Sequence, residues 1–129
     1  MIVVDASVLI EVLLQTAAAP AVSRRIFAPG ESLCAPHLLD VEIAQVLRRY
    51  IRARTMTSAR AEQALQHLAE LPLQRYPHTV LLPRIWQLRD NFTAYDAAYL
   101  ALAEALDAAL VTRDRALASA GSRARVEIL

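Results

Sequence analysis

The sequence predicts an α/β fold built around a parallel sheet of four to five strands. Five short segments have the apolar and β-branched content of strands, and longer segments with helical periodicity separate them. In the clearest strands the apolar residues form continuous runs, which is typical of strands covered on both faces. We expect strands at residues 2–4, 32–35, 73–76, 109–112 and 126–129.

The predicted helices follow from apolar residues three or four positions apart and from the turn signals between them. Pro20 marks a break, and Pro36 is expected to close the second strand. Thr93 is a good N-cap, and Leu65 is expected to face inward. We expect helices at residues 7–15, 21–27, 38–54, 57–71, 79–89, 94–108 and 115–120.

Composition indicates one domain spanning residues 1–129 in a reducing cytoplasm. The chain is 56% hydrophobic, yet no stretch approaches the ~20 apolar residues of a membrane span, and no basic region suggests a signal peptide. Its one cysteine, Cys34, excludes an internal disulfide. The net charge of +1 does not indicate a nucleic-acid partner, although every basic residue is arginine. Genome composition explains this bias, but arginine also pairs well with phosphates and carboxylates.

Two predicted strands run directly into acids. Asp5 follows residues 2–4, and Asp114 closely follows residues 109–112. Asp5 has two interpretations, as a cap of the next helix or as a functional acid at the sheet edge where α/β proteins bind ligands. The repeat at Asp114 favours the functional acid, and we expect Ser7 to take the capping role.

Two further acids lie on apolar helix faces. Glu42 lies on the stripe that contains Leu39, Ile43 and Leu47, and Asp96 begins the stripe of the helix at 94–108. Glu42 would otherwise lie at the border of a rotated stripe or form a buried ion pair. Asp96 would otherwise be an acid that the helix dipole favours.

Parallel strands have their carboxyl ends at one edge, so these four acids are expected to converge. Like charges raise one another's pKa, and a hard cation such as Mg²⁺ or Mn²⁺ relieves the repulsion. The three histidines are too scattered for a zinc site, and no glycine-rich phosphate loop exists.

Three segments, together with the helix that carries Glu42, resemble the PIN-domain family, in particular its VapC-type toxins. The segments are Val3–Leu9, Asn91–Ala103 and Leu110–Asp114, and Tyr95–Ala103 is the most specific. The resemblance implies a three-layer α/β/α domain and a metal-dependent endoribonuclease. It also implies a homodimer that a VapB-type antitoxin neutralises.

By the same resemblance, an acidic quartet of Asp5, Glu42, Asp96 and Asp114 binds Mg²⁺ or Mn²⁺ and is catalytic. The matching positions also make Ser7, Asn91 and Thr112 supporting hydrogen-bonding residues.

The predicted reaction is hydrolysis of an RNA phosphodiester by metal-activated water. Arg113 and Arg115 flank Asp114 and are candidates for binding substrate phosphate, or else surface arginines. The alternatives are a non-catalytic PIN-like module that binds RNA or protein, and a metal-dependent nuclease acting on DNA or another phosphoester hydrolase. The sequence Asp5-Ala6-Ser7 lacks the Asp-x-Asp pair of an aspartyl-phosphate phosphatase.

Overall fold

The computed structural model describes residues 1–129 and contains one sheet of five strands in the order β3-β2-β1-β4-β5. Every neighbouring pair is parallel, as the apolar runs predicted. The strands are β1 (Ile2–Val4), β2 (Leu33–Pro36), β3 (Leu73–Tyr76), β4 (Ala109–Thr112) and β5 (Val126–Ile128).

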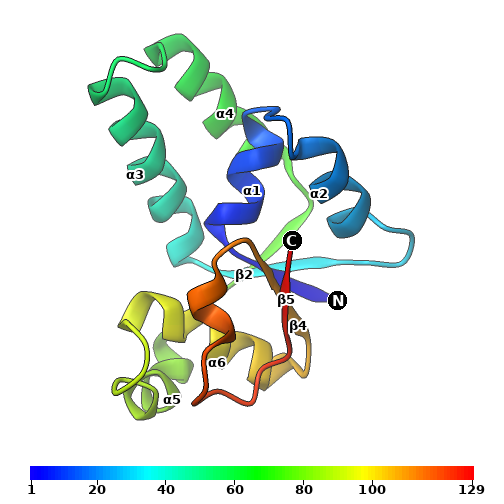
Figure 1. Cartoon of the computed structure of the whole chain (residues 1–129), viewed down its shortest axis with the longest axis vertical. Helices are drawn as coiled ribbons and strands as arrows, with labels where there is room; N and C mark the ends of the chain where they lie inside the picture. Colours follow the sequence, from blue (N-terminus) through cyan, green and yellow to red (C-terminus); the bar gives the residue numbers. More distant parts are fainter.

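Helices cover both faces of the sheet, so the molecule has three layers. In Figure 1, α1 to α4 lie above the sheet, and α5 and α6 lie below it. The α-helices are α1 (Ala6–Leu13), α2 (Ala19–Ile26), α3 (Leu38–Arg52), α4 (Ser58–Glu70), α5 (Leu82–Gln87) and α6 (Ala94–Leu106). Short 3₁₀ turns are η1 (Thr79–Leu81) and η2 (Arg115–Ala118). No helix of the structure combines the length and the apolarity needed to cross a bilayer.

Helix α6 has the longest continuous buried stretch of the helices. Every residue from Ala97 to Ala103 is buried, because the helix packs on β1, β2 and β4 and is covered by α5. Small alanines allow this close approach. The acid at the start of α6 is therefore held by a rigid, buried element.

Several boundaries differ from the predictions. Pro20 lies in the first turn of α2, where a missing N–H costs nothing, so it starts the helix rather than preceding it. Pro36 is the last residue of β2 rather than its stop, at a point beyond the pairing with β1. Residues 79–89 divide into η1 and α5. Leu65 is 39% exposed, since α4 buries Ala61, Ala64 and Leu68 instead.

Glu104 anchors the segment that leads into β5. Its carboxylate accepts two hydrogen bonds from the Arg84 guanidinium, at 2.7 and 3.1 Å, and one each from the Ser122 hydroxyl and the Arg123 backbone N–H, both at 2.8 Å. The bonds from Arg84 are the main reason that the pKa of Glu104 falls to about 2. This buried carboxylate joins α5, α6 and the turn before β5.

Candidate metal centre

The direction of the chain through the sheet reverses between β1 and β4. From β1 it proceeds outward through β2 to β3, and it then returns to place β4 and β5 on the other side of β1. The carboxyl ends of β1 and β4 lie at this reversal point, which is where open α/β sheets bind ligands, and we call this edge of the sheet the crevice. Asp5 directly follows β1, and Asp114 lies two residues after β4.

Asp5 is the most enclosed acid of this crevice, with only 6% of its surface exposed. One carboxylate oxygen accepts hydrogen bonds from the Ser7 hydroxyl at 2.6 Å and from the Val8 backbone N–H at 3.2 Å. The other oxygen accepts one from the Thr112 hydroxyl at 2.5 Å. The bond from Val8 makes Asp5 the N-cap of α1, so the prediction that Ser7 caps this helix is wrong. Asp5 therefore caps α1 and also presents a carboxylate at the edge of the sheet.

Two hydroxyl groups connect Asp5 to the end of β4. The Ser7 oxygen also accepts a hydrogen bond from the Arg113 backbone N–H, and the Thr112 oxygen accepts one from the Asp114 backbone N–H, both at 2.9 Å. Each hydroxyl thus donates to Asp5 and accepts from the backbone beside Asp114. This arrangement fixes the spacing between the two strand-end acids.

Glu42 lies in the second turn of α3, at the border of the buried stripe formed by Leu39, Ile43 and Leu47. The predicted position of Glu42 on the apolar face was therefore wrong by a small rotation about the helix axis. Its Oε1 atom is nevertheless buried and has no hydrogen-bond partner. The Tyr99 hydroxyl on α6 lies near this carboxyl and is also buried without completing a hydrogen bond. Periodicity indicates only that Tyr99 lies on the apolar face of its helix. A buried tyrosine hydroxyl usually has a hydrogen-bond partner, however.

Asp96 enters the crevice from the first turn of α6. The Thr93 hydroxyl accepts a hydrogen bond from the Asp96 backbone N–H and caps the helix, as predicted. Asp114 is exposed, and one of its carboxylate oxygens accepts a hydrogen bond from the Ala116 backbone N–H at the start of η2.

The four acids lie close enough to influence one another electrostatically. Burial raises the pKa of Asp5, Glu42 and Asp96, and neighbouring carboxylates raise it further. Asp114 acts on Asp5 and Asp96, and Asp5 acts on Glu42 and Asp96. No basic side chain forms an ion pair with any of the four acids.

As the side chains stand, no three of them converge tightly enough to form a closed ligand set. Their chemistry nevertheless fits a hard divalent cation. Mg²⁺ and Mn²⁺ take carboxylate oxygens and retain several waters, so they do not need a closed protein cage. The buried, unpartnered Glu42 Oε1 is the atom in the crevice that most needs such a ligand.

The remaining predicted site residues lie at or beyond the margin of the crevice. The Asn91 side chain packs against Gly121 and forms no hydrogen bond with the acids. Gly121 has φ +122 and no room for a side chain there. The Arg113 guanidinium pairs with Glu11 on α1, with Nε 3.3 Å from Oε1, and the exposed Arg115 forms no ion pair.

The PIN domain family model matches residues 2–122. The chain belongs to the PIN-domain family. It is 46% identical over 121 residues to ribonuclease VapC9 of Mycobacterium tuberculosis, covering 94% of this chain and 91% of that protein, which places it in the VapC group.

Two solved structures share the three-layer fold of this PIN domain. VapC20 of M. tuberculosis, described as a sarcin-ricin loop cleaving toxin, superposes with a TM-score of 0.73 at 15% identity and covers 95% of this chain and 96% of that one. VapBC2 from Rickettsia felis, bound to a DNA fragment from its promoter, gives a TM-score of 0.72 at 12% identity and covers 98% of both chains.

Proposed function

We propose that this PIN domain is a metal-dependent endoribonuclease toxin that cleaves RNA phosphodiester bonds in the cytoplasm. The observation that carries the proposal is the cluster of Asp5, Glu42, Asp96 and Asp114 at the reversal point of the sheet, with no basic side chain to neutralise it. Binding a polyanion alone would favour fewer carboxylates at this point. The relatedness to ribonuclease VapC9 supports RNA as the substrate.

In this mechanism Asp5, Glu42 and Asp96 hold the cation, directly or through water, and Asp114 either joins them or orients the attacking water. A bound Mg²⁺ or Mn²⁺ supplies a water of lowered pKa and neutralises charge that develops on the phosphate. Ser7 and Thr112 hold the two Asp5 oxygens in place by donating to them. Because Asp5 is buried and both of its oxygens accept hydrogen bonds, little reorganisation of this carboxylate accompanies the reaction.

The substrate class is tested by incubating the purified chain with a mixed-sequence RNA and with DNA of the same sequence, each with Mg²⁺ or Mn²⁺. We expect RNA fragments and intact DNA, read on a denaturing gel. Equal cleavage of both would indicate a nuclease without sugar selectivity. RNA that is bound but stays intact under every metal condition would indicate a binding module and contradict the proposal.

We also propose that a VapB-type antitoxin silences the enzyme. The support is the VapC9 relationship together with the fold shared with VapBC2. A protein inhibitor of this kind would act by covering the four acids. Co-expression of a small DNA-binding protein encoded beside this chain should restore growth that the chain alone arrests.

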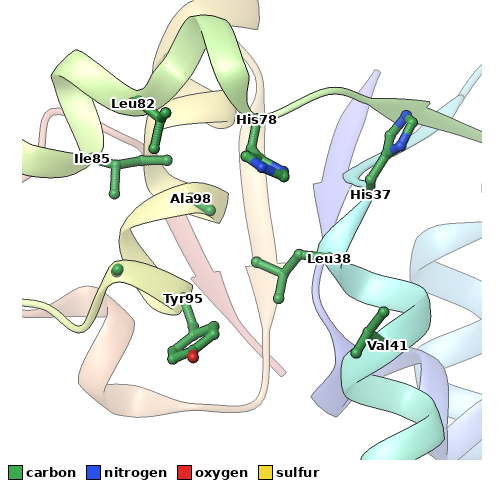
Figure 2. Close-up of a pocket in the computed structure, with 9 residues that line it drawn as sticks. His37, Leu38, Val41, His78, Leu82, Ile85, Tyr95 and Ala98 are labelled. Carbon is green, nitrogen blue, oxygen red and sulfur yellow. The ribbon is translucent and has the colours of Figure 1, made fainter.

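A homodimer is the third part of the proposal, and an apolar groove supports it. Figure 2 shows this groove, about 430 Å³ in volume, with side chains from α3, α5 and α6 facing it. Val41, Leu82 and Tyr95 line it and are 71%, 51% and 66% exposed. Surface of this kind is usually covered by a partner. Val41 and Tyr95 directly precede Glu42 and Asp96, so a second copy seated here would lie beside the acids.

Val41→Glu is expected to convert the dimer to a monomer, because a new carboxylate would be buried without a partner in the interface. We expect dissociation to become at least about 100-fold easier, measured by light scattering across a dilution series. The control Leu65→Glu alters an apolar residue on α4 that is 39% exposed and lies outside the groove, and it should leave the dimer intact. A wild-type chain that is monomeric at high concentration would contradict this part.

A further inference from the structure

A second groove starts at the acidic crevice and runs between α1 and α3. It has a volume of about 310 Å³ and shares Ser7 with the crevice. The Ser7 hydroxyl donates to Asp5 at 2.6 Å and accepts from the Arg113 backbone N–H. Any group at this end of the groove is therefore one side chain away from Asp5.

The lining of this groove combines an aromatic ring, cations and an apolar floor. Tyr50 on α3 is 37% exposed and lines the groove. Arg49 beside it is exposed and pairs with no carboxylate of the chain. Ile10 and Val46 provide the apolar surface between them. This lining complements a nucleotide, whose planar base can stack on the ring and whose phosphate can pair with the cations.

Arg113 borders the groove and pairs with its one acid. Its Nε edge faces Glu11 Oε1 at 3.3 Å, and neither terminal nitrogen of the guanidinium donates a hydrogen bond to the chain. Glu11 is the acid of this groove, and it also accepts a hydrogen bond from Thr16. Its pairing with Arg113 and Thr16 satisfies it locally, so its charge opposes an incoming anion less than a free carboxylate would.

Arg49 lies in a stretch without acids. No acidic residue occurs between Ile43 and Ala61, and the other exposed arginines of α3, Arg48 and Arg52, line a separate groove between α3 and α4. From Glu42 to Arg49 is seven residues, or about 10 Å along the helix axis. Arg49 is therefore within reach of an RNA strand whose cleaved phosphate lies at the acids.

We propose that this groove is a nucleotide subsite for single-stranded RNA next to the cleaved bond. The base stacks on Tyr50, and Arg49 and Arg113 contact the flanking phosphates. This inference rests on the proposed ribonuclease function and names the residues that position its substrate. Two observations support this proposal: the groove is cationic, and it is continuous with the crevice through Ser7. The RNA strand must leave the acids along some surface, and a cationic surface attracts its phosphates.

The test measures binding of a fluorescent, mixed-sequence 12-nucleotide RNA by anisotropy, in the cleavage-deficient Asp96→Asn background, together with the cleavage rate of the otherwise wild-type chain. Tyr50→Ala is expected to weaken binding about 10-fold, whereas Tyr50→Phe keeps the ring and should stay within about twofold. Arg49→Gln should weaken binding several-fold and reduce the salt slope by about one. Arg24→Gln on α2 is the matched control, since Arg24 is exposed and unpaired, and it should change neither measurement.

The outcomes separate the two proposals. If the wild-type chain neither binds nor cleaves RNA, the ribonuclease function fails. If the wild-type chain cleaves RNA and Tyr50→Ala and Arg49→Gln behave like it, the subsite is overturned and the ribonuclease function stands. If these variants keep RNA affinity but escape inhibition by a co-expressed antitoxin, the groove receives that protein instead, and the subsite is again overturned. Thermal melting of every variant confirms that each is folded.

Discussion

Asp5→Asn is expected to reduce RNA cleavage on the order of 10³-fold without unfolding the protein. Asp5 is the carboxylate that both β1 and β4 hold in place, through hydrogen bonds from Ser7, Val8 and Thr112. An asparagine keeps the shape but loses the negative charge that attracts a cation. The measurement is the initial rate of fragment formation from RNA, with Mg²⁺ or Mn²⁺.

The same substitution should leave stability unchanged or higher in metal-free buffer at neutral pH. Burial and the nearby Asp114 disfavour the ionised form of Asp5, as its raised pKa indicates, and asparagine removes that charge. One hydrogen bond changes character, because an amide N–H facing Thr112 cannot accept from its hydroxyl. Asparagine caps a helix about as well as aspartate, so a stable but inactive variant would assign the lost activity to the negative charge and not to the helix cap.

Asp40→Asn is the matched control for this prediction. Asp40 lies in the first turn of α3, two residues before Glu42, but its carboxylate faces Arg75 and accepts hydrogen bonds from it at 2.6 and 2.8 Å. Both side chains are partly exposed, so the loss of this pair should cost at most about 1 kcal/mol and leave cleavage intact. Equal loss of activity in both variants would contradict a specific role for Asp5.

Removal of divalent metal is expected to abolish cleavage, and its addition should stabilise the fold more at pH 8 than at pH 5. Asp5, Glu42 and Asp96 all have raised pKa values, for which burial is the largest cause. Above the ordinary carboxyl values of 3.8 and 4.5, the folded state therefore holds more protons than the unfolded state. Stability from these groups falls as pH rises from those values through the raised ones.

A bound cation reverses this trend, because it binds the ionised carboxylates of the folded state. At a hundredfold excess over the dissociation constant it contributes about 2.7 kcal/mol. For a chain of this length that corresponds to a rise in Tm of about 10 °C at pH 8. At pH 5 protons compete for the same oxygens, so the rise should be clearly smaller.

Thermal melts with EDTA, Mg²⁺ and Mn²⁺ at the two pH values provide the measurement. The double variant Asp5→Asn/Glu42→Gln retains the fold but should lose most of the metal-induced rise. An equal rise in this variant, or one that is independent of pH, would show that the metal binds elsewhere. Cleavage that persists in EDTA would contradict metal dependence directly.

Much of the fold follows from local pattern. The apolar runs at 2–4 and 109–112 predicted strands covered on both faces in a parallel sheet, and these are β1 and β4. Buried strands are recognisable because every side chain along them must be apolar. Helix ends were less predictable, as Pro20 and Pro36 show, since a proline is tolerated at the edge of an element as well as outside it.

The sequence predicted which acids form the candidate site, but not which side chains from other elements contact them. The termini of parallel strands necessarily share one edge, so Asp5 and Asp114 could be placed together from the sequence. The Tyr99 hydroxyl beside Glu42 and the pairing of Glu11 with Arg113 could not, because each joins different elements. Asn91 was expected at the acids through the resemblance, yet its side chain packs against Gly121.

The sequence by itself determined the strand–helix order, the parallel sheet and the acids that it brings to one edge. Only the tertiary structure decided that Asp5 caps α1 while facing the crevice, that Glu42 lies at the border of its stripe, and that Tyr50 opens into a groove. The physical reason is that periodicity shows which face of one element is apolar, but not which residues of other elements that face contacts. The rotation of a helix and the partner of each polar atom depend on how neighbouring elements pack, and residues distant in the chain set that packing.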